Sequence, residues 1–135
     1  MGLCCMKKFD NFSSALATLK RYCRYDLNQD IILTGIVKQF EMVFELACKS
    51  MKEVMYEEGI IEAETGSPAE IIKLGYQYAY IDNQDAWEKI RKDRNVSTCL
   101  YDENESKQLL YRIINYIEEF EELKSKLLAK ISNLG

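Results

Sequence analysis

The rest of the chain is expected to pack around residues 35–54, which read GIVKQFEMVFELACKSMKEV. Apolar residues recur there at steps of three and four, the period of an α-helix that buries one face. They are Ile36, Phe40, Val43, Phe44, Ala47, Met51 and Val54. Three further apolar residues, Val37, Leu46 and Cys48, widen this face beyond a narrow coiled-coil stripe. The pattern therefore predicts a central helix with several packing partners.

A line of charged residues runs along the same helix. Glu41, Glu45 and Lys49 are four residues apart, so their side chains lie one above another. Such a row can be a solvated Glu–Lys ladder, which adds about 0.2–0.5 kcal/mol per pair. Because Phe40 and Phe44 flank its carboxylates, the row can also line a polar pocket. The residues alone leave both interpretations open.

The composition favours a helical protein. The 135 residues include one proline and six glycines, which leaves few positions that break a helix. Hydrophobic residues make up 47% and charged residues 30%, a balance typical of globular proteins. We expect a single domain over residues 1–135, because domains typically hold about 100–150 residues.

Four more helices are predicted around the central one, which is expected to have Asp30 as its N-cap and to end before Gly59. The clearest boundary is SPAE, residues 67–70, which combines a capping box with proline at the first helical position. The expected helices span about residues 7–25, 30–58, 67–80, 84–95 (capped by Asp82) and 102–132 (capped by Asp102). IIEAETG, residues 60–66, is expected to be a loop. These elements predict an all-α fold, an antiparallel four-helix up-and-down bundle with one additional short helix.

The predicted inward faces follow the same period. In the third helix Ile71, Ile72, Leu74 and Tyr78 are expected to face the core. Tyr76, Tyr78 and Tyr80 cannot all do so, and at least one of them is expected at a surface. The acidic and basic residues between 118 and 126 form the solvated face of the last helix and need no ligand.

Charge and residue counts exclude several function classes. A net charge of −4 disfavours non-specific binding to nucleic acids. The chain has no histidine, which rules out Ser-His-Asp and Cys-His catalysis and imidazole metal ligands. Its five cysteines form neither a disulfide framework nor a zinc signature, so we expect no metal and no cofactor.

No membrane role is predicted. No apolar run approaches the roughly 20 residues of a membrane span. The opening MGLCCMKKF is too short and polar for a signal peptide, and Met6 stands where a myristoylation signal needs Ser or Thr. A cytoplasmic location is therefore expected.

Arginines share a helix face with bulky apolar residues near residue 90. Trp87, Ile90 and Arg94 are three and four apart, and Arg91 lies on the same side. A guanidinium on such a face needs an acidic partner, because an isolated buried charge costs several kcal/mol. Glu41 and Glu45 are natural partners. Such a pair can merely hold two helices in register, or it can belong to a pocket that contacts a phosphate or base.

Three segments carry a family resemblance. FEMVFELACK (residues 40–49), SPAEII (67–72) and DRNVSTCLYDE (93–103) resemble the nucleotidyltransferase substrate-binding protein family, a bundle family within the HEPN class. The resemblance covers nearly the whole chain. It implies a homodimer that binds a small nucleotidyltransferase encoded nearby, and a module often regarded as a toxin–antitoxin pair.

The resemblance also implies which residues form a site. Arg94 and Asn95 match the family's arginine motif, and Tyr101 and Asp102 match its Tyr-Asp pair. The matching charged positions of the central helix are Glu41, Glu45 and Lys49. Cys99 replaces the family histidine, Gln39 an arginine and Cys48 a tryptophan.

These departures separate three hypotheses. A thiol has a pKa near 8.5 and replaces a histidine as acid or base only when that pKa is lowered. The favoured function is therefore a non-catalytic subunit that binds a substrate or nucleotide for a nucleotidyltransferase. The alternatives are an RNA-cleaving toxin that uses Arg94, Asn95, Tyr101 and Cys99 across a dimer interface, and a purely structural dimeric interaction module.

Overall fold

A computed structural model describes residues 3–97 and 102–134, which form five α-helices and one 3-10 helix. Their bounds are α1 Leu3–Tyr22, α2 Asp30–Glu57, η1 Ile61–Thr65, α3 Pro68–Gln77, α4 Gln84–Val96 and α5 Glu103–Leu134. The described residues contain no strand. The predicted all-α class is therefore confirmed.

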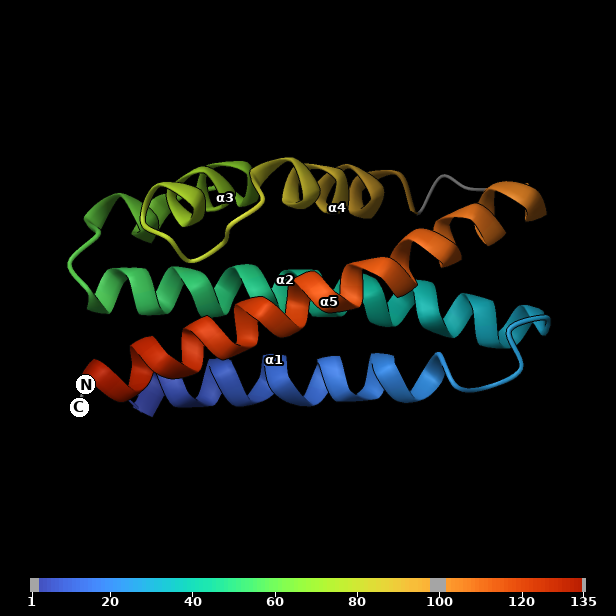
Figure 1. The fold of residues 1–135 in the computed structure, drawn as a ribbon, viewed down its shortest axis with the longest axis horizontal. Helices are drawn as coiled ribbons and strands as arrows, with labels where there is room; N and C mark the ends of the chain where they lie inside the picture. The colour runs from blue at the N-terminus through green and yellow to red at the C-terminus, as the bar shows by residue number, and fades with distance from the viewer. Residues whose placement is uncertain (1–2, 98–101, 135) are drawn as a thin grey trace.

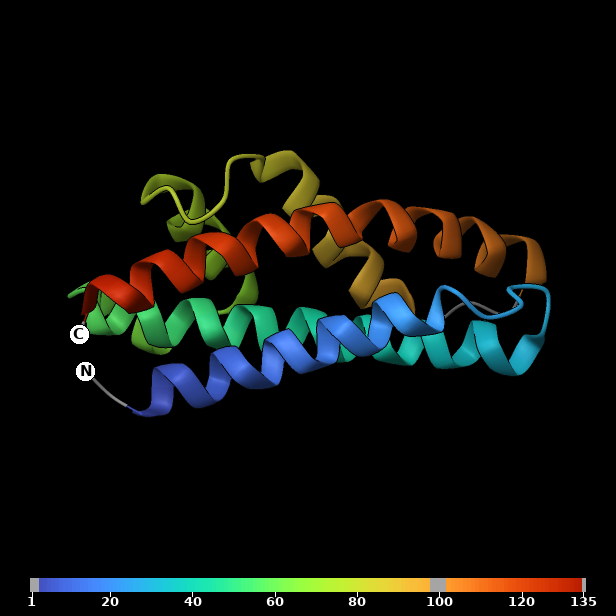
Figure 2. The ribbon, with the colours of Figure 1, turned by 60° about the horizontal axis from the view of Figure 1, so that its bottom comes forward.

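The helices form an antiparallel four-helix bundle. Helices α1, α2 and α5 run alongside one another (Figures 1 and 2). Helix α2 is reversed relative to α1, and α5 is reversed relative to α4. Helices α3 and α4 follow each other along one side of α2 and together take the place of the fourth helix. The start of α1 and the end of α5 lie at the same end of the bundle. The predicted up-and-down arrangement is confirmed, with its third leg divided into two short helices.

The core is built on α2, as the periodicity predicts. All seven residues predicted to face inward in this helix are at most 3% exposed. Aromatic rings join α2 to its neighbours: Phe40 lies 6.4 Å from Phe120 of α5, and Phe44 lies 6.5 Å from Trp87 of α4. Rings at such separations pack favourably beyond the area that they bury. Helix α2 is thus the common wall against which the other helices pack.

Three predicted helix ends are confirmed. The Ser67 hydroxyl accepts from the Glu70 N–H, and the Glu70 carboxylate accepts from the Ser67 N–H, which completes the capping box of α3. Helix α2 ends before Gly59, whose φ of +91° suits glycine. At α5, Asp102 caps as predicted, because its Oδ1 accepts from the Asn104 N–H at 2.9 Å.

Other predicted boundaries were wrong. Asn83 rather than Asp82 is the N-cap of α4, and its side chain accepts from the Ala86 N–H. Gln29 rather than Asp30 precedes α2, with no capping bond from its side chain. Helix α1 begins earlier than expected, at Leu3, and the predicted loop 60–66 contains the 3-10 helix η1. Local capping preferences can be met at adjacent positions, so they locate an end only to within a residue or two.

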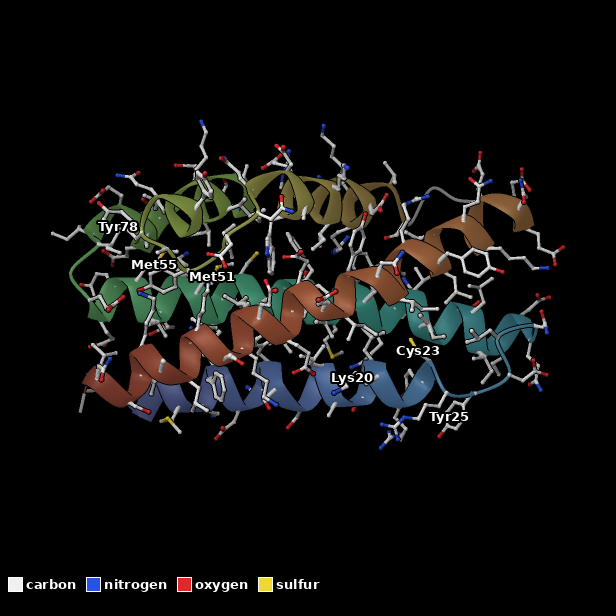
Figure 3. All side chains as sticks on the ribbon, viewed as in Figure 1. Lys20, Cys23, Tyr25, Met51, Met55 and Tyr78 are labelled. Carbon is white, nitrogen blue, oxygen red and sulfur yellow. The ribbon has the colours of Figure 1, made fainter. Side chains whose placement is uncertain are left out.

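The end of α3 corrects the prediction for its tyrosines. Tyr78 was expected in the core, but it is 39% exposed and points away from the bundle (Figure 3). Tyr80 is fully buried instead, and its hydroxyl donates to Glu58 at the end of α2. The helical period stops at Gln77, so the residues after it no longer follow the inward pattern. Tyr76 is on the surface, as at least one tyrosine had to be.

Two methionines fill the space between α2 and α3. Met51 and Met55 are fully buried and point from α2 toward α3 (Figure 3). A Cβ on Gly75 of α3 would lie 3.4 Å from the Met51 sulfur and 3.6 Å from Met55 Cε. The small residue therefore lets α3 approach α2 closely. Among the described residues, no helix combines the length and apolar character that crossing a bilayer requires.

Candidate functional site

Two adjoining pockets follow α2 on the side where α3 and α4 pack. The first has a volume of about 340 Å³ and lies where α2, the start of α3 and the end of α4 meet. It is lined by Phe44, Glu45, Ser67, Pro68, Ala69, Arg91, Arg94 and Asn95. The second, of about 250 Å³, is lined by Phe44, Glu45, Cys48, Lys49, Lys52, Gly66, Pro68 and Ile71. Phe44, Glu45 and Pro68 belong to both, so the pockets share a boundary.

An ion pair spans the first pocket from α4 to α2. Arg94 Nη2 lies 3.4 Å from Glu45 Oε1, with side-chain exposures of 26% and 57%. Arg91 uses its Nη2 to bind Glu88 of the same helix at 2.9 Å. The Nε atoms of both arginines are buried without a hydrogen-bond acceptor among the described residues. Each guanidinium therefore has donors that its protein contacts do not use.

The position of the arginines follows from the packing of α4. Trp87 and Ile90 are buried on the face of α4 that meets the core. Arg91 and Arg94 lie one residue and four residues beyond Ile90, so they border this apolar face and are half-buried. Arginine can bury its aliphatic stem along such a border while its charged head reaches the pocket.

The Glu41 carboxylate does not pair with the Arg94 guanidinium. Its Oε2 lies 2.6 Å from the hydroxyl of Ser97, which also lies 2.8 Å from the backbone oxygen of Arg94. Lys38 approaches the other carboxylate oxygen at 3.8 Å. Of the two acidic partners that the sequence proposed for Arg94, Glu45 forms the ion pair and Glu41 instead holds the end of α4.

The other predicted site residues divide into three groups. Asn95 lines the first pocket with Arg94, and Lys49 lines the second pocket beside Glu45. Asp102 is exposed and serves as the cap of α5. Cys99 and Tyr101 lie outside the described residues.

Nine residues that line the two pockets were absent from the predicted site, among them Arg91, Lys52, Phe44 and Pro68. Arg91 could have been included, since it shares the helix side of Arg94, and Lys52 follows Lys49 by one turn. The spacing of Phe44 assigned it to the core. It is indeed buried, and it also lines both pockets. Pro68 gave only a helix-start signal, and nothing local indicates that this start faces Arg94.

Cys48 contributes an uncharged wall to the second pocket. It is 7% exposed, and burial raises its pKa to about 12, with a further contribution from the nearby Glu45 carboxylate. A thiol with this pKa stays protonated at neutral pH and is a poor nucleophile. The pocket therefore combines apolar walls with the charges of Glu45, Lys49 and Lys52.

A second polar cluster joins α4 to α5 away from the pockets. Asp93 accepts from Arg112 Nε and Nη2, at 2.8 and 3.1 Å, and from the Tyr116 hydroxyl at 2.6 Å. Burial and the bond to Asp93 raise the pKa of Tyr116, and the bond to Asp93 also raises the pKa of Arg112. Tyr116 stacks on Phe40, with ring centroids 6.0 Å apart. This cluster joins α4, the helix of the two pocket arginines, to α5.

The arrangement suits the binding of an anion that carries an apolar group. Guanidinium groups bind phosphate and carboxylate groups through several parallel hydrogen bonds. The walls formed by Phe44, Pro68 and Ile71 can cover an apolar or planar part of the same ligand. Among the described residues, no cluster of three or more acidic or cysteine side chains is placed to hold a metal ion.

The chain is similar to proteins of one family. A family model described as nucleotidyltransferase substrate-binding protein-like matches residues 7–129. A solved structure from Haemophilus influenzae, described as the fold of a substrate-binding domain of a nucleotidyltransferase, superposes with a TM-score of 0.77 and 20% identity. That match covers 88% of this chain and 98% of the other, and it shows a shared fold.

The chain also matches a curated relative, but over a smaller part of that protein's length. The probable ribonuclease HepT of Haemophilus influenzae is 25% identical over 93 residues, which are 67% of this chain and 64% of the relative. The chain thus matches less than two thirds of that ribonuclease. The resemblance drawn from the three sequence segments is confirmed by the family match, which spans most of the chain. The protein therefore belongs to the nucleotidyltransferase substrate-binding protein-like family.

Proposed function

We propose that this protein is a non-catalytic accessory subunit that binds a nucleotide or other substrate for a small nucleotidyltransferase encoded nearby. The observation that carries the proposal is the first pocket, where Arg91 and Arg94 face Glu45 and Phe44 between α2, α3 and α4. Nucleotidyltransferase substrates carry phosphate groups or accept them, and paired guanidinium groups recognise phosphate. Homodimer formation and a toxin–antitoxin role belong to the same proposal.

Family membership supports the pairing with a nucleotidyltransferase. The family model and the solved structure are both described by their relation to such an enzyme. The charge of the chain also fits a binding subunit with a local cationic site. Its net charge of −4 gives no general attraction for polyanions, so anion binding depends on the arginines of the pocket.

Co-expression with the neighbouring nucleotidyltransferase tests the pairing. We expect the two chains to co-elute in size-exclusion chromatography, with a light-scattering mass well above the 15.8 kDa of this chain. Arg94→Gln should keep the complex but weaken nucleotide binding by at least about tenfold, because charge-assisted hydrogen bonds are lost. Isothermal titration calorimetry on the complex measures this loss.

The matched control removes a cation far from the pocket. Lys20 of α1 pairs with Glu121 of α5 at 2.9 Å, and Lys20→Gln should leave both complex formation and nucleotide binding unchanged. Failure to isolate any complex with the enzyme would overturn the accessory-subunit proposal.

The ribonuclease relative favours one second candidate, an RNA-cleaving toxin. In that function Arg94 and Asn95 would act with Tyr101 and Cys99 at an interface between two copies. Arg94 is within reach of solvent and its ion pair is loose, so it could contact RNA. Growth arrest and RNA cleavage that disappear in Arg94→Ala would support this candidate, and an unchanged phenotype would exclude it.

A further inference from the structure

Glu45 occupies a central position between the two pockets. Among their described lining residues it is the one carboxylate, and it belongs to both pockets. The cations around it are Arg91 and Arg94 on one side and Lys49 and Lys52 on the other. Its carboxylate therefore lies between two pairs of cationic side chains.

We propose that Glu45 is an internal competitor for a small phosphorylated ligand, whose phosphate group displaces the Glu45 carboxylate from Arg94. The identity of the ligand as a nucleotidyltransferase substrate rests on the function proposed above. The displacement itself rests only on the geometry of this chain.

The contact between Glu45 and Arg94 is suited to displacement. Its 3.4 Å separation is long for a charge-assisted hydrogen bond, which typically measures about 2.7–2.9 Å. Glu45 is 57% exposed, so its side chain can turn into solvent without burying a charge. Exposed ion pairs are weak, and a better acceptor can replace the carboxylate.

A phosphate group is a better acceptor than Glu45. It offers three oxygens and up to two negative charges, against two oxygens and one charge. Arg91 and Arg94 lie one turn apart on α4 and line the same pocket, so one phosphate can contact both. Each arginine retains donors that its present partners, Glu88 and Glu45, do not use.

The lining of the second pocket indicates which chemical groups the rest of the ligand carries. Once Glu45 turns away, Phe44 and Pro68 remain as the shared wall of the pockets of about 340 and 250 Å³, and one ligand can reach into both. This space is within the range of small-molecule sites, about 300–1,000 Å³. Phe44 and Ile71 can cover an apolar or planar group there. Lys49 and Lys52, which make no ion pair with another described residue, can take a second anionic group.

Titration of the isolated chain with pyrophosphate at low ionic strength tests the competition. Glu45→Gln keeps the shape of the side chain and removes its charge, so we expect about fivefold tighter binding than in the unmodified chain. Arg94→Gln should weaken binding by at least about tenfold. Calorimetry gives the dissociation constants, and circular dichroism checks that each variant is folded.

The matched control is Glu121→Gln. It changes the net charge by the same amount and breaks the Lys20–Glu121 ion pair, which lies outside both pockets. Equal tightening in Glu121→Gln and Glu45→Gln would show a general charge effect and overturn the proposal. Unchanged or weaker binding in Glu45→Gln would overturn it as well.

A comparison of ligands separates a small phosphorylated molecule from a nucleic acid. ADP should reproduce the pyrophosphate results, including the gain in Glu45→Gln. A short single-stranded RNA without a terminal phosphate should bind more weakly than ADP, and tighter RNA binding would overturn the proposed ligand class. None of these titrations requires the nucleotidyltransferase, so failure to form that complex leaves the test of Glu45 intact.

Discussion

Asp93 joins α4 to α5 without lining either pocket. Its carboxylate, with a side-chain exposure of 14%, accepts three hydrogen bonds from Arg112 and Tyr116 of α5. The neighbouring residue in α4 is Arg94, which faces Glu45 on the opposite side. Asp93 thus holds one side of α4 on α5 while the other side lines the pocket.

Replacing Asp93 tests this role at the residue scale. Asp93→Ala should lower the free energy of unfolding by about 2–3 kcal/mol, because the buried Tyr116 hydroxyl and the Arg112 guanidinium lose their acceptor. Asp93→Asn should cost less, since its amide oxygen still accepts. Urea denaturation measures both variants. Glu121→Ala, at a more exposed ion pair, should cost under about 1 kcal/mol, and an equal loss there would contradict the argument.

Residue spacing predicted the Glu45–Arg94 pair only in part. It showed that Arg94 needs an acid and that Glu41 and Glu45 lie on one line of α2. These two carboxylates are one helical turn apart, about 6 Å along the axis. Which of them meets Arg94 depends on how far α4 is shifted along α2, and that shift is set by core packing around Trp87 and Phe44.

At the scale of elements, two helices end in the same way with different residues. After α2, the Ile60 N–H bonds to the Met55 oxygen and the Gly59 N–H to the Tyr56 oxygen. After α3, the Tyr80 N–H bonds to Gly75 and the Ala79 N–H to Tyr76. Both patterns are Schellman motifs, which need a residue in the left-handed region. That residue is Gly59 in one and Ala79, at φ +63°, in the other.

These two motifs form a matched pair of tests. Ala79→Gly should stabilise the protein by about 0.5–1 kcal/mol, because glycine adopts this conformation without the steric cost of a Cβ. Gly59→Ala should destabilise it by about 1 kcal/mol for the converse reason. Thermal unfolding followed by circular dichroism measures both changes. A destabilising Ala79→Gly would show that unfolded-state entropy outweighs the backbone strain.

The Schellman motif after α3 also explains why Tyr78 was misassigned. A helix that continued to residue 80 would place Tyr78 near the line of Ile71 and Leu74. The left-handed turn at Ala79 ends the helical period and carries Tyr80 into the core instead. Alanine carries no sequence signal for such a turn, whereas Gly59 marked the end of α2 correctly.

At the scale of the whole molecule, burial is distributed unevenly among the four legs. Helix α2 has eleven buried residues and α5 has eight, whereas α3 has three and α4 has two. Local opening requires less free energy where fewer apolar contacts are lost. Within the divided leg, α3 and α4 each have fewer buried residues than α2 or α5, and both helices contribute residues to the first pocket.

Hydrogen–deuterium exchange tests this uneven stability. Amide protons in α3 and α4 should exchange at least about tenfold faster than those in the middle of α2 and α5, which corresponds to about 1.4 kcal/mol less protection. Pyrophosphate should slow exchange in α4 if the first pocket is its site. Uniform protection across all helices would contradict the prediction, because the bundle would then open only as one unit.

The sequence by itself determined the helical class, the central position of α2 and the ends marked by Ser67 and Gly59. These features follow from periods and caps that extend over a few neighbouring residues. Only the tertiary structure decided that α3 and α4 share one leg, that Glu45 and not Glu41 meets Arg94, and that Pro68 closes the pocket. The contacts of Glu45 with Arg94 and of Pro68 with the other pocket walls join residues more than 20 positions apart, and all three features depend on how whole helices pack against the core.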